Sequence, residues 1–178
     1  MTRPAPVPIR AAVVTVSDRS FRGEREDTGG ATVEAALLRL LGDAVRVVER
    51  VLVPDEQSDV AWQLKRIADT GAADLVLTTG GTGLSPRDVT PQATLSVADY
   101  AVPGIPEAMR AATRGALPVA ILSRQAAVVR GRTLIVNLPG SPRGAVECLE
   151  VVASVLPHAV EILRGGSGDS HPRPANRV

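Results

Sequence analysis

Short runs rich in β-branched residues alternate along this chain with longer segments in which apolar residues recur every three or four positions. The first run, residues 10–16 (RAAVVTV), is almost entirely apolar, as expected for a strand that a parallel sheet buries on both faces. This alternation predicts an α/β fold with a mostly parallel sheet. The expected strands span residues 10–16, 44–53, 74–79 and 117–122, and the expected helices span residues 29–41, 58–70, 91–98, 106–114 and 142–163.

Two further apolar runs, residues 126–129 and 133–137, flank Arg130-Gly131-Arg132. Such a pair of runs around a glycine turn predicts an antiparallel hairpin, which we place at one edge of the sheet. The length of 178 residues suits one domain. We expect a flexible lead-in at residues 1–9, a single α/β domain at residues 10–165 and a disordered tail at residues 166–178, where Gly, Ser, Pro and charged residues predominate.

Composition excludes several classes of function. The formal charge is +1 and aromatic residues make up 2% of the chain, so neither a basic face nor a row of stacking rings is available for nucleic acid. No apolar run approaches the roughly 20 residues of a membrane span, and no apolar signal core precedes the first strand. Cys148 is the only cysteine, which excludes a disulfide framework within the chain. We therefore expect a cytoplasmic protein that binds neither nucleic acid nor membrane.

The common nucleotide-binding motifs are missing. Lys65 is the only lysine, and no GxxxxGK[ST] sequence surrounds it, so a P-loop is excluded. No GxGxxG sequence follows the first expected strand, so a dinucleotide dehydrogenase has no support. The histidines, His158 and His171, lie in an apolar helical stretch and in the tail, and their spacing does not suit a two-histidine metal site.

Polar loops follow the expected strands, and the carboxyl ends of parallel strands share one edge of a sheet. The loop after the third strand holds Gly80, Gly81 and Gly83 around Thr82. Closely spaced glycines let backbone N–H groups approach an anion, so this loop predicts a phosphate cradle. A tight turn without a ligand is the alternative.

Two acids, Asp55 and Asp88, each lie just beyond a strand end. Because Mg²⁺ is commonly held by one or two carboxylates together with substrate phosphates, this pair suits a metal site. The alternatives are that Asp55 caps the helix that follows it and that Asp88 stabilises its own turn. Arg87 and Arg124 are candidates for binding phosphate or pterin groups, with surface ion pairs as the alternative.

These loops resemble the molybdenum-cofactor biosynthesis family, with the closest likeness to the molybdopterin adenylyltransferases and the G domains of gephyrin-type proteins. Any one of the motifs is common, but their ordered occurrence between residues 10 and 165 is specific. The motifs that carry the resemblance are Val16-Ser17-Asp18-Arg19, Val53-Pro54-Asp55-Glu56-Gln57, Thr78-Thr79-Gly80-Gly81-Thr82-Gly83, Arg87-Asp88-Val89-Thr90-Pro91, Ile121-Leu122-Ser123-Arg124 and Asn137-Leu138-Pro139-Gly140-Ser141.

The resemblance implies a three-layer α/β fold, a homotrimer, and transfer of AMP from ATP to the terminal phosphate of molybdopterin, with Mg²⁺, giving adenylyl-molybdopterin and pyrophosphate. The family's two catalytic acids match Asp55 and Asp88, which we also expect to hold the Mg²⁺. Molybdate insertion would then fall to a separate protein. The substrate-binding residues that we expect are Ser17, Asp18, Gly80, Gly81, Thr82, Gly83, Arg87, Ser123, Arg124, Asn137, Gly140 and Ser141.

Three other functions stay open at this point. A catalytically silent paralogue would hold or carry molybdopterin without adenylylating it. A trimeric scaffold would hand substrate to a partner. An unrelated α/β nucleotide hydrolase is the third alternative, since fold alone does not settle function. Release of pyrophosphate from ATP in the presence of molybdopterin separates the enzyme from the silent paralogue.

Overall fold

The computed structural model describes residues 7–166 of the chain. Most of the expected lead-in, residues 1–6, and most of the expected tail, residues 167–178, lie outside the described residues. The strands are β1 (Ile9–Val16), β2 (Val45–Val53), β3 (Leu75–Thr79), β4 (Tyr100–Ala101), β5 (Ala127–Arg130) and β6 (Thr133–Leu138). The α-helices are α1 (Asp18–Phe21), α2 (Thr28–Leu41), α3 (Gln57–Asp69), α4 (Thr90–Ser96), α5 (Gly104–Thr113), α6 (Pro142–Val152) and α7 (Leu156–Leu163), and short 3-10 helices are η1 (Gly42–Ala44), η2 (Pro118–Leu122) and η3 (Ala153–Val155).

The strands of residues 7–166 form one six-stranded sheet in the order β2-β1-β3-β6-β5-β4. Strands β2, β1, β3 and β6 are parallel, whereas β5 runs antiparallel to both of its neighbours. The β5–β6 hairpin turns at Gly131, whose φ of +57° suits glycine. The predicted α/β class, the mostly parallel sheet and the hairpin are therefore confirmed. The hairpin was expected at the edge itself, but the two-residue strand β4 lies outside it.

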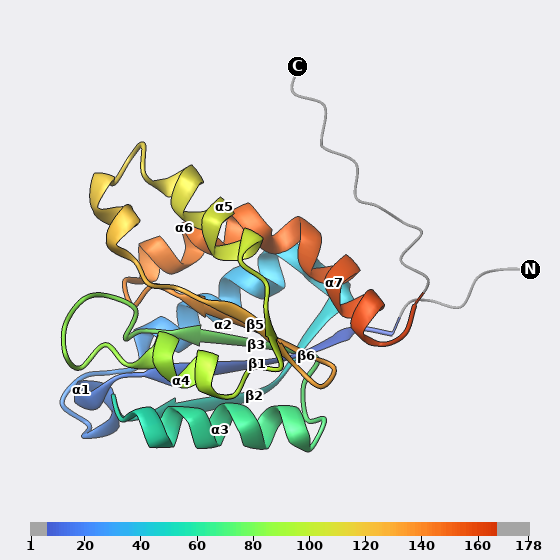
Figure 1. Ribbon diagram of the computed structural model, residues 1–178, viewed down its shortest axis with the longest axis horizontal. Coiled ribbons are helices and arrows are strands. Elements are labelled where there is room, and N and C mark those ends of the chain that lie inside the picture. The colour runs from blue at the N-terminus through green and yellow to red at the C-terminus, as the bar shows by residue number, and fades with distance from the viewer. Residues whose placement is uncertain (1–6, 167–178) are drawn as a thin grey trace, which may run out of the picture.

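Two apolar layers flank the sheet, so the fold has three layers, with α2, α5, α6 and α7 over one face and α3 and α4 over the other (Figure 1). Alternation along β1 explains this division. Val13 packs with Leu37 of α2 in one core cluster, and the adjacent Val14 packs with Leu64 of α3 in the other. All four side chains are fully buried, and each such burial contributes about 1.5–3 kcal/mol to folding.

One expected strand, residues 117–122, is wrong. The segment instead forms the 3-10 helix η2, and Leu117, Val119, Ile121 and Leu122 are 50% to 64% exposed. Pro118 lacks the backbone N–H that a strand interior must donate, which disfavours a place within the sheet. An apolar run identifies side chains that can be buried, but it does not identify the surface that covers them.

The helices follow the predicted segments closely at most of their ends. The long C-terminal helix expected over residues 142–163, however, is interrupted by a 3-10 turn at residues 153–155, and Pro157 lies in the first turn of α7. The short helix α1 was not predicted; Ser17 caps it by accepting a hydrogen bond from the N–H of Ser20. Within residues 7–166, no helix combines the length and apolar character needed to cross a membrane.

Candidate active site

Glycines bring the carboxyl ends of three strands into close contact. Gly80 follows β3 with a φ of +107°, and a Cβ built on it would clash with the carbonyl oxygen of Val16 at the end of β1. A Cβ on Gly140, after β6, would lie 3.2 Å from the Cα of Gly80. The loops after β1, β3 and β6 therefore meet at Gly80, as parallel strands require, and a side chain at Gly80 would separate them.

The segment from Gly81 to Gly83 presents three successive backbone N–H groups. None of the three donates a hydrogen bond to a residue within 7–166, whereas the N–H of Gly80 donates to the carbonyl oxygen of Leu138 at 3.3 Å. The positive φ angles of Gly80 and Gly81 turn the chain at the start of this segment. Unpaired N–H groups in such a turn form a concave binding site for an anion.

Asp55 and Asp88 both border this glycine segment. A Cβ built on Gly81 would lie 3.3 Å from Oδ1 of Asp55, and one built on Gly83 would lie 2.9 Å from Oδ2 of Asp88. The two acids come from the loops after β2 and β3, 33 positions apart in the chain (88 − 55). The structure thus brings the two predicted catalytic carboxylates to one short stretch of backbone.

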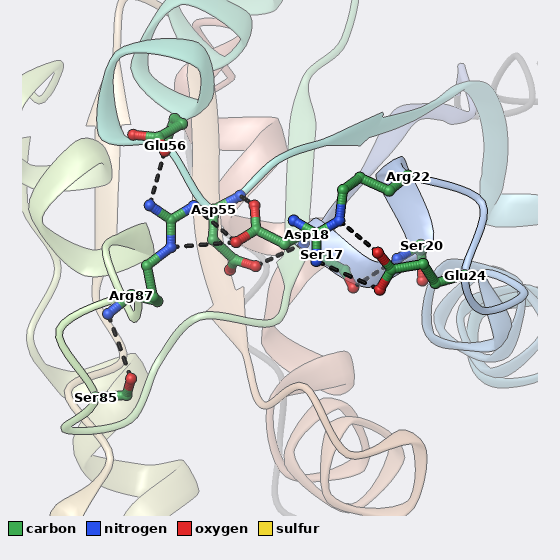
Figure 2. Close-up of polar contacts among 9 residues, drawn as sticks. All are labelled: Ser17, Asp18, Ser20, Arg22, Glu24, Asp55, Glu56, Ser85 and Arg87. Carbon is green, nitrogen blue, oxygen red and sulfur yellow. Dashed lines mark hydrogen bonds and ion pairs between the residues drawn. The ribbon is translucent and has the colours of Figure 1, made fainter.

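Asp18 and Asp55 form a reciprocal pair that joins the loops after β1 and β2. The N–H of Asp18 donates to Oδ2 of Asp55 at 2.7 Å, and the N–H of Asp55 donates to Oδ1 of Asp18 at 3.0 Å (Figure 2). The carboxylate of Asp55 therefore does not cap the following helix; α3 begins after Glu56, which makes no side-chain cap. The pair fixes the orientation of Asp55 before any ligand arrives.

Arg87 connects the third loop to this pair. Its Nη2 lies 2.7 Å from Oδ2 of Asp18, and its Nη1 lies 2.7 Å from Oε1 of Glu56 (Figure 2). Hydrogen bonds to Glu56 and Asp18 raise the pKa of the guanidinium above its usual value. The side chain of Arg87 is 52% exposed, and exposed ion pairs of this kind contribute little to stability, so Arg87 exchanges partners at low cost.

The environments of Asp18 and Asp55 shift their pKa values in opposite directions. Hydrogen bonds from the backbone of Asp55 and from Arg87 lower the pKa of Asp18. Burial raises the pKa of Asp55, assisted by repulsion from Asp18 and Asp88, and the hydrogen bond from the backbone of Asp18 only partly offsets this. A cation at Asp55 would relieve that repulsion and favour the ionised carboxylate.

Asp88 and Arg124 shape the loop that carries the second acid. Oδ2 of Asp88 accepts a hydrogen bond from the N–H of Ser85 at 2.8 Å, so this carboxylate does stabilise its own turn. Arg124 donates from Nε to the carbonyl oxygen of Gly83 at 2.7 Å and from Nη2 to the carbonyl oxygen of Asp88. Arg124 therefore holds both ends of the loop through its backbone instead of pairing with an acid on the surface.

Three further predicted residues serve local structure. Asn137 is fully buried, and its Nδ2 donates to the hydroxyls of Thr78 and Thr94 at 3.0 and 2.9 Å while Oδ1 accepts from the N–H of Ala126. Both amide hydrogens of Asn137 are thus committed within the protein. Ser141 caps α6 by accepting from the N–H of Gly144. Ser123 accepts from the N–H of Gln125 at 3.5 Å and faces a hollow.

This hollow, of about 370 Å³, lies between the glycine segment, η2 and α6. Its apolar walls include Leu84, Leu117 and Leu122. Its polar lining includes the predicted residues Thr82, Gly83, Ser123 and Ser141, together with Gln125 and Cys148. Neither Asp55 nor Asp88 lines it, although Gly83, which does, lies against Oδ2 of Asp88.

The two acids fit a magnesium ion that also binds substrate phosphates. Oδ1 of Asp55 and Oδ1 of Asp88 accept no hydrogen bond from residues 7–166, which leaves each carboxylate one oxygen for a metal. Among the described residues, no three His, Cys, Asp or Glu side chains form a complete metal site. Two carboxylates completed by phosphate oxygens and waters are the usual arrangement for Mg²⁺.

Sequence reasoning missed two residues that shape this site. Thr90 is fully buried, and its hydroxyl donates to the carbonyl oxygen of Gly80 at 2.9 Å, which braces the glycine turn from the start of α4. Its position two residues after Asp88, in the same polar loop, is the sequence feature that could have identified Thr90. Gln125 lines the hollow at 5% exposure, and nothing local in the sequence distinguishes it from a surface glutamine.

A model of the probable molybdopterin-binding domain matches residues 12–158. The chain belongs to this family. It is 40% identical over 176 residues to the molybdopterin adenylyltransferase of Haemophilus influenzae, covering 92% of this chain and 89% of the relative, and 40% identical to the one from Escherichia coli K12, covering 92% and 90%.

Solved structures of the family share the fold. The molybdopterin biosynthesis enzyme MoaB of Thermus thermophilus has 49% sequence identity and a TM-score of 0.81, covering 88% of this chain and 97% of that one. The range matched by the family model, residues 12–158, includes the glycine segment and both acids. The resemblance drawn from the loop motifs is thereby confirmed.

Proposed function

We propose that this chain is a molybdopterin adenylyltransferase, which transfers AMP from ATP to the terminal phosphate of molybdopterin and releases pyrophosphate. The observation that carries the proposal is the convergence of Asp55 and Asp88 on Gly81 and Gly83, beside three unpaired backbone N–H groups. Relatives bearing this activity in their names match about nine-tenths of the chain at 40% identity.

The reaction demands positioning more than proton transfer. The terminal phosphate of molybdopterin is a monoester with a second pKa near 6, so it is mostly a dianion at neutral pH and requires no strong general base. One of its oxygens attacks the α-phosphorus of ATP. A new oxygen–phosphorus bond forms, and the bond from the α-phosphorus to the bridging oxygen breaks, with its electron pair leaving on pyrophosphate. The obstacle is the mutual repulsion of two anions.

The protein's own groups meet this obstacle. The N–H groups of Gly81, Thr82 and Gly83 donate to phosphate oxygens and fix their position. Arg87 exchanges its exposed partner Glu56 for a phosphate oxygen and shares the charge of the departing pyrophosphate. Asp55 and Asp88 hold Mg²⁺, which when bound neutralises phosphate charge. Arg124 donates to the carbonyl oxygens of Gly83 and Asp88 and so fixes the loop that carries Asp88, which makes it a positioning residue.

The direct test is pyrophosphate release by the purified protein with ATP and molybdopterin. We expect release that requires both substrates and that stops when EDTA removes divalent cations. Release that persists after thorough chelation would remove the metal from this scheme. Binding of molybdopterin without pyrophosphate release at any Mg²⁺ concentration would instead identify a carrier.

The assembly and location of the protein complete the proposal. The family resemblance implies a homotrimer, and Ile121 on η2, 64% exposed and outside the hollow, provides apolar surface for subunits to cover. Light scattering should give three times the protomer mass, and a monomeric mass at micromolar concentration would contradict it. We place this trimer in the cytoplasm, where fractionation of cells should recover it.

A further inference from the structure

The hollow beside the glycine segment has the lining of a ring-binding pocket. Leu84, Leu117 and Leu122 give it apolar walls, and its volume of about 370 Å³ falls in the range of small-molecule sites. It also contacts the reaction centre directly, because Gly83 lines the hollow and lies against Oδ2 of Asp88. A ligand with its phosphate at the glycine segment would therefore place its other end in the hollow.

The amide of Gln125 has a defined orientation in this hollow. Its Nε2 lies 3.3 Å from the carbonyl oxygen of Asn137 and 3.7 Å from Sγ of Cys148. A carbonyl oxygen only accepts hydrogen bonds, so the nitrogen must face Asn137 and the oxygen must point elsewhere.

The oxygen of that amide is left without a partner. Oε1 of Gln125 accepts no hydrogen bond from residues 7–166, and it is accessible to solvent. Gln125 is only 5% exposed and lines the hollow, so Oε1 is reached from the hollow. Because Oε1 is open to solvent, water can donate to it, and a ligand that displaces this water must supply a donor of its own or lose affinity.

We propose that Gln125 is a specificity-determining residue, whose Oε1 accepts a hydrogen bond from an N–H group of the substrate's nitrogen heterocycle seated in the hollow. This inference rests on the proposed function, which supplies two such rings, the adenine of ATP and the pterin of molybdopterin. Both carry N–H donors on their edges and flat faces suited to apolar walls. Gln125 thus recognises the ring by a hydrogen bond, whereas the glycine segment and the acids bind the phosphates.

The test compares the protein with its Gln125→Met variant, which removes the amide and keeps the side-chain volume. In the first arm, affinity is measured for ATP and for purine riboside triphosphate, which lacks the exocyclic amine. If adenine occupies the hollow, the unmodified protein binds ATP about 5- to 20-fold more tightly than the analogue, and Gln125→Met abolishes this preference. In the second arm, calorimetry with molybdopterin under anaerobic conditions detects a loss of similar size if the pterin occupies it.

The matched control is Gln63→Met. Gln63 is also 5% exposed, but it lies on α3 across the sheet from the hollow, so its substitution should leave both affinities unchanged. Gln125→Asn, which keeps an amide and withdraws its oxygen by one methylene, provides a milder variant with the same expected direction.

The outcomes separate this inference from the proposed function. If Gln125→Met and Gln125→Asn bind both ATP and molybdopterin as tightly as the unmodified protein does, the proposed role of Gln125 is overturned. Equal weakening of ATP and its analogue, with unchanged molybdopterin binding, also overturns it, because that result reports a structural brace. Since both arms measure binding, they remain decisive even if pyrophosphate release fails.

Discussion

The two ends of the sheet use acids and arginines in opposite ways. At the amino end of β3, the carboxylate of Asp74 is 7% exposed and accepts four hydrogen bonds, three from Arg10 and one from Arg164. This cluster joins the start of β1 to the end of α7, far from the loops at the other end of the sheet (Figure 1). At the carboxyl end, Asp55 and Asp88 each retain an oxygen without a hydrogen bond from a described residue.

The difference appears in the ionisation of Asp74, which is buried, and of Asp55, which is partly buried. Burial opposes ionisation of Asp74, but the hydrogen bonds from Arg10 and Arg164 outweigh it and hold its pKa far below the usual value. At Asp55 burial prevails and the pKa is raised. An acid whose oxygens are all hydrogen-bonded to arginines, such as Asp74, stabilises the fold when ionised. Asp55, which we propose holds Mg²⁺, lacks such partners, and its ionisation is unfavourable until a cation binds.

Asp88→Asn should produce the largest change. The amide oxygen can still accept the hydrogen bond from Ser85, so we expect the melting temperature to stay near that of the parent. Without the negative charge that holds the metal, pyrophosphate release should fall by a factor of about 100 or more. Steady-state kinetics at saturating substrates measures this, and turnover at the parental rate would show that Asp88 has no catalytic role.

Asp74→Asn should produce the opposite pattern. Loss of the charge leaves Arg10 and Arg164 without their carboxylate, which should lower the free energy of unfolding by about 2–4 kcal/mol. Turnover per folded molecule should be unchanged, because the cluster lies at the other end of the sheet. Urea unfolding curves measure the first effect, and an unchanged midpoint would refute the stabilising role.

The stability difference between the parent and Asp74→Asn should also depend on pH. The folded pKa of Asp74 lies below its unfolded value near 4, so its contribution is complete above roughly pH 5 and is lost as the pH falls further. The gap between parent and Asp74→Asn should therefore narrow below about pH 4. A gap that stays constant down to pH 3 would contradict the lowered pKa.

Asp55→Asn should change stability less than Asp74→Asn does, and with the reverse sign. Because the folded pKa of Asp55 is raised, its ionisation at pH 7 disfavours the folded state, and the neutral amide removes this cost. We expect the free energy of unfolding at pH 7 to rise by up to about 1 kcal/mol. A clear loss of stability, measured with Asp74→Asn in the same buffer, would mean that Asp55 is a structural acid like Asp74.

The sequence was sufficient for those parts of the fold that depend on local pattern. The β-branched runs of β1 and β3 and the glycine turn at Gly131 predicted parallel strands and a hairpin. Residues 117–122 looked equally apolar, yet residues 118–122 form the exposed helix η2, because burial depends on neighbours that are distant in the chain. Strand β4 consists of only two exposed residues, Tyr100 and Ala101, which are too few to show an alternating pattern.

For the candidate site, the sequence predicted which loops meet but not which side chains pair. Loops after parallel strands share one edge, so the approach of Asp55 and Asp88 to Gly81 and Gly83 could be expected from topology. The partners of individual side chains could not. Arg124 donates to a carbonyl oxygen 41 residues away, and Gln125 donates to one 12 residues away, and neither spacing reflects a local rule.

The most direct test of the account is a double-mutant cycle on the two acids. Asp55→Asn, Asp88→Asn and the double variant are compared with the parent in pyrophosphate release. If both carboxylates hold one ion at the glycine segment, the double variant should lose no more activity than the more damaging single variant. Losses that multiply, so that the double variant shows the product of the two single effects, would mean that Asp55 and Asp88 act independently and would contradict the shared site.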